Sequence, residues 1–291
     1  FLAASAHDAG LAFEASVCGG IPIIRSIAQG LPANRITSLY GILNGTTNYI
    51  LTRMSDEGGD FGEILKRAQD LGYAEADPTM DVDGTDAVQK LAILCRLAFG
   101  VSLPYRSVLR EGITKISPVD IAFANDLGYT IKLLGIAKSS DRGLEVRVHP
   151  ALVPQDALLA NIKNEFNAIE IVGDAAGPQV YTGRGAGALP TASAVVSDLL
   201  YQAERRMAGR QRVSRQMVDV SRIEPLAAEE IETSYYCRFT VEDTPGVLAH
   251  IATIFSSHNI SIARVIQEGR SETEGGSVPL IMTTHEACER S

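Results

Sequence analysis

The spacing of hydrophobic residues predicts strands in the first two thirds of the chain. Residues 36–42 are rich in β-branched and other apolar residues, as a strand is. Residues 128–140 and 143–153 read as two strands paired around a turn at Asp141–Gly143, and residues 167–183 read as two more. Together these segments predict a sheet.

Between the strands, the apolar spacing changes to the period of a helix. Residues 61–73 predict an amphipathic helix that Gly72 closes, and residues 87–100 predict one that is apolar on almost every side, as a buried helix is. A helix also follows the Asn-Gly turn after residues 36–42, and another begins near Pro190. Strands mixed with helices indicate a mixed α/β fold of the α+β class.

The first residues of the chain predict a helix, a strand and a second helix. Residues 1–12 read as the end of a helix, and residues 13–17 as a short strand. A Gly-Gly turn then leads to a helix with Pro22 near its start. Because the chain has no initiator Met, we expect it to be part of a longer protein.

The pattern changes near residue 221, which predicts a domain boundary. Residues 221–233 are acidic and contain proline, as a linker does. They separate a first domain, residues 13–220, from a second, residues 234–291. The second reads as a strand, a turn at Asp243–Gly246, a helix and two further strands. This β-α-β-β order predicts a small ferredoxin-like domain that is cut short.

Composition excludes several classes of protein. The formal net charge of −9 argues against nucleic acid or an anionic membrane surface as a partner. No apolar run approaches the roughly 20 residues of a membrane-spanning helix. The four cysteines are scattered without a C-x-x-C pair, so neither a zinc site nor a disulfide framework is indicated and a reducing cytoplasm is the simplest setting.

Five carboxylates crowd the stretch from Ala74 to Asp86, ahead of Lys90. A calcium loop is excluded, because its bidentate glutamate would be replaced by Lys90. A solvated acidic loop stays open, since that is the commonest role of a charge run. Asp77 and Asp83 read as loop or capping residues.

Lys90 lies in the apolar helix that follows, and Asp86 precedes it by one turn. Residues four apart share a helix face, so Asp86 can orient the amine. Burial would lower the pKa of Lys90 toward the range that suits proton transfer. The alternative is a lysine that only reaches solvent beside Asp86.

Residues 72–94 closely resemble the signature of homoserine dehydrogenases: Gly-aromatic-x-Glu-x-Asp-Pro, an aspartate, then Gly-x-Asp-x-x-x-Lys. Residues 13–24, 41–51 and 182–199 resemble three further segments of that family, in the same order. The resemblance covers about residues 1–220. It implies NADP- or NAD-dependent interconversion of L-homoserine and L-aspartate 4-semialdehyde, in the biosynthesis of threonine, methionine and isoleucine.

The resemblance also implies roles for individual residues. Lys90 would be the general acid/base, and Glu75, Asp86 and Asp81 would bind the substrate. Gly183, Gly185 and Gly187 would contact the cofactor, although the spacing is not the dinucleotide fingerprint and a tight turn stays open. Asn44, Gly45, Thr46 and Thr47 would lie near the active site.

A monovalent cation, sodium, is implied at a second place. Its ligands would be Glu14 and the main chain at Val17, Gly19 and Ile21. Hard cations prefer oxygen ligands, and a Gly-rich bend exposes carbonyl groups. A plain turn with a surface glutamate is the alternative. Cys18 stands where the family leads us to expect glycine.

Residues 234–291 resemble an ACT domain, which implies an amino-acid effector such as threonine. The family also implies a homodimer, and an N-terminal nucleotide-binding domain and second active-site lysine ahead of Phe1, toward which residues 183–220 would return. On that expectation, these 291 residues alone are inactive. An amino-acid-binding regulatory protein without catalysis, or an enzyme for another semialdehyde, stay open as alternatives.

Overall fold

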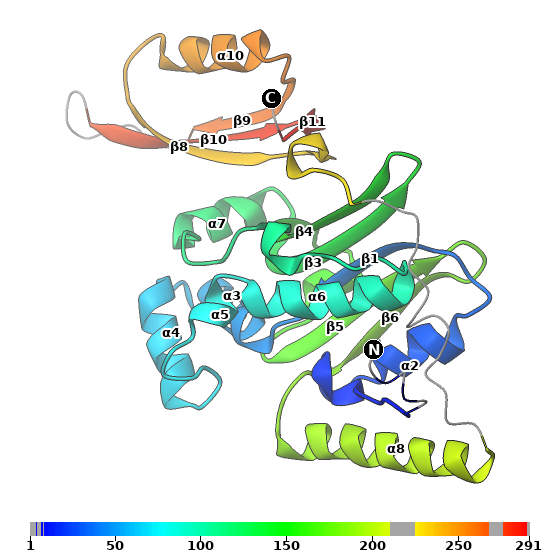
Figure 1. Cartoon of the computed structure of the whole chain (residues 1–291). Helices are drawn as coiled ribbons and strands as arrows, with labels where there is room; N and C mark the ends of the chain where they lie inside the picture. The colour runs from blue at the N-terminus through cyan, green and yellow to red at the C-terminus, as the bar shows by residue number, and fades with distance from the viewer. Residues whose placement is uncertain (1–3, 5–6, 8, 210–224, 268–275, 290–291) are drawn as a thin grey trace. The chain divides into compact units, whose positions relative to one another are not determined.

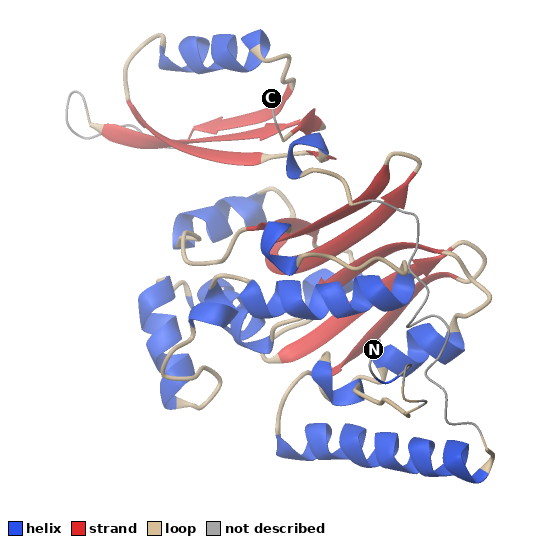
Figure 2. Cartoon of the chain, viewed as in Figure 1, coloured by secondary structure: helices blue, strands red, loops and turns tan. Residues whose placement is uncertain are grey.

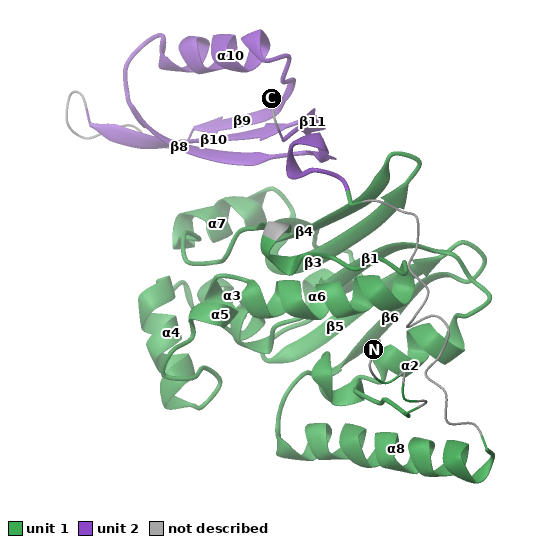
Figure 3. Ribbon diagram, in the orientation of Figure 1, with its two compact units in different colours: residues 1–225 green, residues 226–291 purple. Residues whose placement is uncertain are grey.

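The computed structural model describes Ala4, His7 and residues 9–209, 225–267 and 276–289. The chain divides into two compact units, residues 1–225 and residues 226–291 (Figure 3). Each unit is described by itself. The predicted linker, residues 221–233, contains this division, and its first four residues lie outside the described part.

A six-stranded sheet organises the first unit (Figure 1). Its strands are β1 (Ile36–Ile42), β2 (Leu109–Arg110), β3 (Tyr129–Ser140), β4 (Gly143–Pro154), β5 (Phe166–Gly173) and β6 (Gly177–Arg184). Their order is β2-β4-β3-β1-β5-β6, and all neighbours are antiparallel except β2 and β4. The strands predicted from residues 36–42, 128–153 and 167–183 are therefore present.

Helices and short helical turns connect the strands (Figure 2). They are η1 (Glu14–Ser16), α2 (Ile23–Arg25), η2 (Ser26–Gly30), α3 (Gly45–Glu57), α4 (Phe61–Asp70), α5 (Thr79–Val82), α6 (Thr85–Ala98), η3 (Tyr105–Ser107), α7 (Pro118–Asp126), η4 (Leu158–Asn161) and α8 (Ala188–Met207). Local sequence explains several starts: Asn44 caps α3, Asp60 caps α4, and Ser117 forms a capping box ahead of Pro118.

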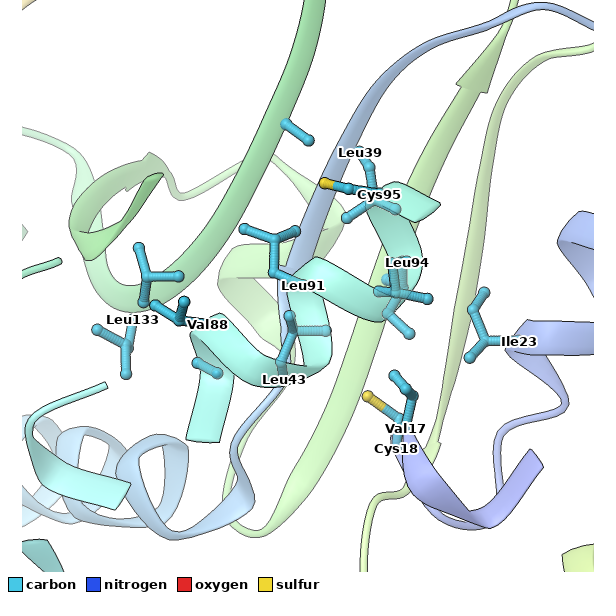
Figure 4. Close-up of a cluster of buried hydrophobic side chains, with 14 of the residues drawn as sticks. Val17, Cys18, Ile23, Leu39, Leu43, Val88, Leu91, Leu94, Cys95 and Leu133 are labelled. Atoms are coloured by element: carbon cyan, nitrogen blue, oxygen red, sulfur yellow. The ribbon is translucent and has the colours of Figure 1, made fainter. Parts of the chain in front are cut away.

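Strand alternation divides the apolar residues of the first unit between two cores. On β3, Leu133 and Ala137 enter the larger core with residues of α3 and α6. Leu134 and Ile136 belong to the smaller core, together with Leu159 of η4. Successive side chains of a strand point to opposite faces, so the sheet separates the two. Figure 4 shows α6 inserting Val88, Leu91, Leu94 and Cys95 into the larger core.

Two predictions at the beginning of the chain are wrong. Residues 9–12 are not helical, and residues 13–17 form the 3₁₀ turn η1 instead of a strand. The reason is tertiary: the buried Glu14 carboxylate accepts hydrogen bonds from the backbone N–H groups of Ile24 and Arg25, at 2.7 and 3.1 Å. That contact folds the segment back on the start of the next helix. The other residues of the predicted helix 1–12, apart from Ala4 and His7, lie outside the described part.

The second unit is a three-stranded antiparallel sheet with one helix. Its main elements are β8 (Tyr236–Glu242), α10 (Val247–Ser257), β9 (Ile262–Gln267) and β10 (Ser277–Thr284). The remaining ones are η5 (Ala228–Glu230), β7 (Glu232–Thr233) and β11 (Ala287–Cys288). The sheet order is β8-β10-β9, and β7 pairs with β11. The β-α-β-β order matches the prediction.

Candidate active site

Lys90 lies on α6 with its amine held by two acceptors. Its Nζ donates to Asp86 Oδ2 at 2.7 Å and to the carbonyl oxygen of Leu43 at 3.1 Å. The Lys90 side chain keeps 21% of its exposure and that of Asp86 keeps 26%. The amine is thus fixed inside the protein surface and still accessible to a small molecule, so it does not simply extend into solvent.

Asn44 joins the two acidic residues beside this lysine. Its Nδ2 donates to Asp81 Oδ1 at 2.7 Å and to Asp86 Oδ2 at 2.9 Å. Its Oδ1 accepts from the backbone N–H of Thr47 at 2.9 Å and so caps α3. One buried amide therefore orients two carboxylates and a helix N-terminus at once. The Asn-Gly pair that resembled a hairpin turn in sequence is a helix cap.

The start of α3 faces the same place. The Lys90 amine is bound to the carbonyl of Leu43, two residues before the helix begins at Gly45. Thr46 donates from its hydroxyl to the carbonyl of Tyr73, which links this helix end to the acidic loop. Because the first N–H groups of a helix lack partners within it, this end favours an anion.

Glu75 is less fixed than the other predicted substrate residues. It is exposed, and no hydrogen bond in the described part joins its carboxylate to Lys90, Asp81 or Asp86. Its backbone carbonyl accepts from Gln69 at 3.0 Å, which anchors the loop. The tethered loop leaves the carboxylate free to meet a ligand.

The other two acids of the stretch have local structural contacts. Asp77 accepts from both the backbone N–H and the hydroxyl of Thr79, and these bonds hold the pKa of Asp77 below its usual value. Asp83 accepts from the backbone N–H of Thr85 at 2.8 Å and thereby caps the start of α6. These contacts agree with the loop and capping roles predicted for both.

The bend predicted to hold a cation contains two consecutive left-handed residues. Cys18 has a φ of 55° and Gly19 has a φ of 44°, and Val17 and Ile21 are buried. The carboxylate of Glu14 is already bonded to two backbone N–H groups of α2. Burial raises the pKa of Glu14 above its usual value. A cation here would therefore be held by main-chain oxygens rather than by this carboxylate.

The glycine-rich turn before α8 separates into two inward positions and one outward position. A Cβ at Gly183 would meet Ile21 at 3.1 Å, and one at Gly185 would meet Asn167 Oδ1 at 1.8 Å. A side chain at either position would therefore crowd a neighbour, most severely at Gly185. Gly187 is exposed, has a φ of 114° and precedes the first residue of α8. Of the three, it has the most exposed backbone.

Two buried polar residues near this region were not singled out in the sequence. Asn167 on β5 donates from Nδ2 to Cys18 Sγ at 3.4 Å. Lys132 on β3 is 2% exposed and donates to Asn48 Oδ1 at 3.0 Å and to the carbonyl of Ile162 at 2.5 Å. A polar residue within a strongly apolar strand was the available signal for both.

Each unit contains a hollow, and neither hollow is lined by Lys90 or its hydrogen-bond partners. One of about 260 Å³ is lined by residues 10–14, α2 and α8, with Arg25 and Asp198 paired across it at 2.9 Å. The other, in the second unit, measures about 500 Å³ and surrounds the turn that contains Pro245 and Gly246, with His250 of α10 at its wall. Among the described residues, no cluster of three or more acidic, histidine or cysteine side chains could hold a metal. No helix in that part has the length and apolarity needed to span a membrane.

Comparison with known proteins identifies the family. Residues 22–200 match the model of the homoserine dehydrogenase family, and residues 235–290 match that of the ACT domain. A homoserine dehydrogenase of Pseudomonas aeruginosa is 45% identical over 99% of this chain and 67% of its own length. One of Neisseria gonorrhoeae is 44% identical over 96% and 64%. The chain spans about two thirds of the length of these relatives.

Solved structures agree with that match. The crystal structure of a homoserine dehydrogenase from Thiobacillus denitrificans superimposes with a TM-score of 0.93 at 44% identity, over 100% of this chain and 66% of that one. A hyperthermophilic archaeal homoserine dehydrogenase in complex with NADPH gives a TM-score of 0.60 at 27% identity, over 69% and 58%. The fold and the matched regions thus define a homoserine dehydrogenase-type domain followed by an ACT domain. The chain belongs to the homoserine dehydrogenase family.

Proposed function

We propose that this chain carries the substrate site of an enzyme that interconverts L-homoserine and L-aspartate 4-semialdehyde. The observation that supports it best is the cluster of Lys90, Asp86, Asp81 and Asn44 at the start of α3. It combines a positioned proton donor, two oriented carboxylates and a helix N-terminus. An amino acid with a reactive carbonyl or hydroxyl group needs each of these.

In the proposed reaction, Lys90 transfers the proton. A nicotinamide cofactor, when bound, would supply the hydride that reduces the aldehyde. The Lys90 ammonium donates its proton to the carbonyl oxygen, and the neutral amine takes one back in the reverse direction. Asp86, 2.7 Å from Nζ, keeps the amine pointed toward the substrate.

The charges of the substrate fit the same cluster. Its ammonium group would lie among Glu75, Asp81 and Asp86, which gives the crowded acids a purpose beyond the lysine. Its carboxylate would lie at the free N–H groups of Gly45 and Thr46, where the helix dipole favours an anion. An analogue without the ammonium would leave carboxylates unpaired, and so another semialdehyde should be a poor substrate.

The cofactor would be NADP or NAD. Gly187 exposes backbone beside the N-terminus of α8, a 20-residue helix, and the two inward glycines, Gly183 and Gly185, shape the turn. A phosphate or carboxamide group could approach there. NADPH is the cofactor named with the archaeal relative.

We also propose further properties that the resemblance to the family implies. A sodium ion would bind main-chain oxygens at Glu14, Val17, Gly19 and Ile21. The enzyme would work in the cytoplasm as a homodimer, in the pathway to threonine, methionine and isoleucine. Threonine would bind the ACT domain near Gly246; titration calorimetry that detects no threonine binding would remove this part.

The deciding experiment compares Lys90 with Lys132 in the protein at its full natural length. We expect Lys90→Ala to lower kcat for NADP-dependent homoserine oxidation by about 10²- to 10⁴-fold, the usual contribution of an acid/base group. Homoserine should still bind in calorimetry. The control, Lys132→Met, removes another inward lysine and should retain kcat within about threefold, since Lys132 contacts no residue of the proposed site.

The other outcomes identify the alternatives. Equal rates for Lys90→Ala and the unchanged protein would show that Lys90 is only a packed lysine. Homoserine binding without oxidation in any variant would favour a regulatory binding protein. The 291-residue chain alone, assayed in parallel, is expected to be inactive, because its described part contains no βαβ unit that would hold a dinucleotide.

A further inference from the structure

Four segments distant in sequence meet around the side chain of Asn167. They are the bend at Cys18–Gly20, the start of α3 at Gly45, the beginning of β5 and the turn at Gly185. Gly20 donates to the carbonyl of Arg184 at 3.0 Å, which ties the bend to the turn. The sites proposed for cation, substrate and cofactor therefore meet at one buried asparagine.

Glycines make this meeting possible. A Cβ at Gly19 would lie 2.5 Å from the carbonyl oxygen of Gly185, and one at Gly45 would lie 2.7 Å from that of Glu165. A Cβ at Gly185 would lie 1.8 Å from Asn167 Oδ1. Real Cβ atoms do not approach so closely, so backbone packs against backbone here and the carboxamide fills what remains between them.

The carboxamide of Asn167 is unusual in its hydrogen bonding. Asn167 is 1% exposed, and its Nδ2 donates only to the sulfur of Cys18, at 3.4 Å. Its Oδ1 has no hydrogen-bond partner among the described residues. Buried polar atoms normally have partners, and an exception needs an explanation. If this position only had to be filled, an apolar side chain could fill it without leaving an oxygen unpaired.

The location of the carboxamide supplies an explanation. On one side Cys18 is close enough to Lys90 and Asp86 for their charges to act on its thiol. On the other side Oδ1 lies against Gly185, in the turn that leads to Gly187 and α8. A displacement of the turn relative to α3 would change the distance between cofactor and substrate, on which hydride transfer depends.

We propose that Asn167 is a positioning residue: its carboxamide sets the spacing between the Gly183–Gly187 turn and the substrate site at α3 and Lys90. The proposal rests on the proposed function. Asn167 touches neither the substrate nor the cofactor and acts through Gly185. Its loss should therefore reduce the rate of hydride transfer more than it weakens the binding of homoserine.

The test combines two substitutions that change side-chain size, Asn167→Ala and Gly185→Ala, in the protein at its full natural length. Asn167→Ala should lower kcat about 10- to 30-fold with the KM for homoserine within about threefold, since misplacement by about 1 Å can cost up to 100-fold. Gly185→Ala should lower kcat by about 100-fold, because its Cβ collides with Asn167. In the Asn167→Ala background, the added methyl group has room, and Gly185→Ala should cost less than about threefold more.

A matched control lies at the other end of the same strand. A Cβ at Gly173 would meet Asn34 Oδ1 at 2.8 Å, and that oxygen accepts from the backbone N–H of Ala176 at 2.8 Å. This asparagine-over-glycine contact is six residues from Asn167, or about 20 Å along a strand. Asn34→Ala and Gly173→Ala should lower Tm without changing kcat by more than about twofold.

Three results would decide the matter. Homoserine deuterated at its hydroxyl-bearing carbon should show a larger isotope effect on kcat in Asn167→Ala than in the unchanged protein, as expected when hydride transfer becomes slower. Unchanged kcat in Asn167→Ala, or equal damage by Gly185→Ala in both backgrounds, would overturn the positioning role. If the unchanged protein does not oxidise homoserine, the proposed function fails, while Tm of the paired variants still reports whether the two side chains compete for space.

Discussion

Lys90 and Lys132 lie on α6 and β3, two elements packed on each other, and both turn inward, yet their surroundings differ. Lys90 has a carboxylate at 2.7 Å and keeps part of its surface open. Lys132 is 2% exposed, and its hydrogen-bond acceptors are the neutral Asn48 Oδ1 and Ile162 carbonyl. The nearby charges that act on it come from Lys163 and Asp56, which pair with each other at 3.0 Å.

The presence or absence of a countercharge is what distinguishes the lysine proposed as the acid/base group from Lys132. A countercharge offsets the cost of removing an ammonium from water, whereas neutral oxygens do so only in part. Burial accordingly lowers the pKa of Lys132 to about 8. Asn48 also donates to the carbonyls of Ile162, Asn164 and Phe166, so the Lys132 network fixes the segment before β5. Depth of burial alone would have favoured Lys132 over Lys90 as the candidate acid/base residue.

Among the changes that test the comparison of Lys90 with Lys132, removing the negative charge of Asp86 should have the largest effect. In Asp86→Asn, Lys90 would be held by neutral oxygens, as Lys132 is, and Asn44 would lose a charged acceptor. We expect kcat for homoserine oxidation to fall by about 10²- to 10³-fold, within the range for a misoriented acid/base group. Steady-state kinetics with Asp77→Asn as the control measures it, because Asp77 bonds only within its own loop. Equal losses in both variants would contradict the role given to Asp86.

The pH dependence of stability tests Lys132. Its folded pKa, about 8, is below the ordinary value of 10.5, so between these pH values the unfolded chain binds more protons. The free energy of unfolding should therefore gain a contribution as pH rises from 8 to 10.5, on the order of 2–3 kcal/mol. Lys132→Met should lack this gain. Urea unfolding of both proteins at pH 7, 8, 9 and 10 measures it, and parallel curves would mean that Lys132 is hydrated.

Glu14 gives the smallest and opposite effect. Burial raises its pKa, so from about pH 4.5 upward the unfolded chain loses this proton first and the folded state loses stability as pH rises. Glu14→Gln should remove that slope. The amide oxygen of this variant can still accept from the backbone N–H of Ile24, but the hydrogen bond from Arg25 is lost. The free energy of unfolding should fall by about 1 kcal/mol at neutral pH as a result. Thermal unfolding from pH 4 to pH 8 compares the variant with the unchanged protein. If stability depends on pH equally in both, Glu14 is not the group responsible.

Regular segments of the chain were predictable because their signals are local. The strands on either side of Asp141–Gly143 run over twelve residues each and are separated by a turn signal, and Gly72 follows the end of its helix with a φ of 77°. Residues 13–17 were mistaken for a strand because their shape depends on a contact between Glu14 and residues ten positions later. The helix at Pro118–Asp126 was missed, although Ser117 and Pro118 are a local start signal.

The candidate site divides in the same way. Asp86 and Lys90 share one helix, so spacing alone places them together. Asn44 meets Asp81 and Asp86 from 37 and 42 residues away, and no local pattern predicts that bridge. Gly183 and Gly185 stay predicted cofactor contacts, and only the structure showed that an added Cβ there would meet Ile21 and Asn167.

The sequence by itself determined the family, the order of most elements and the pairing of Lys90 with Asp86, because motifs, periodicity and helical spacing are properties of neighbouring residues. Only the tertiary structure decided that Lys132 is buried against neutral acceptors, without a carboxylate bonded to its amine. It also brought Cys18, Gly45, Asn167 and Gly185 to one point. The physical reason is that desolvation and close packing depend on what the whole chain places around a group, which its neighbours in sequence do not specify.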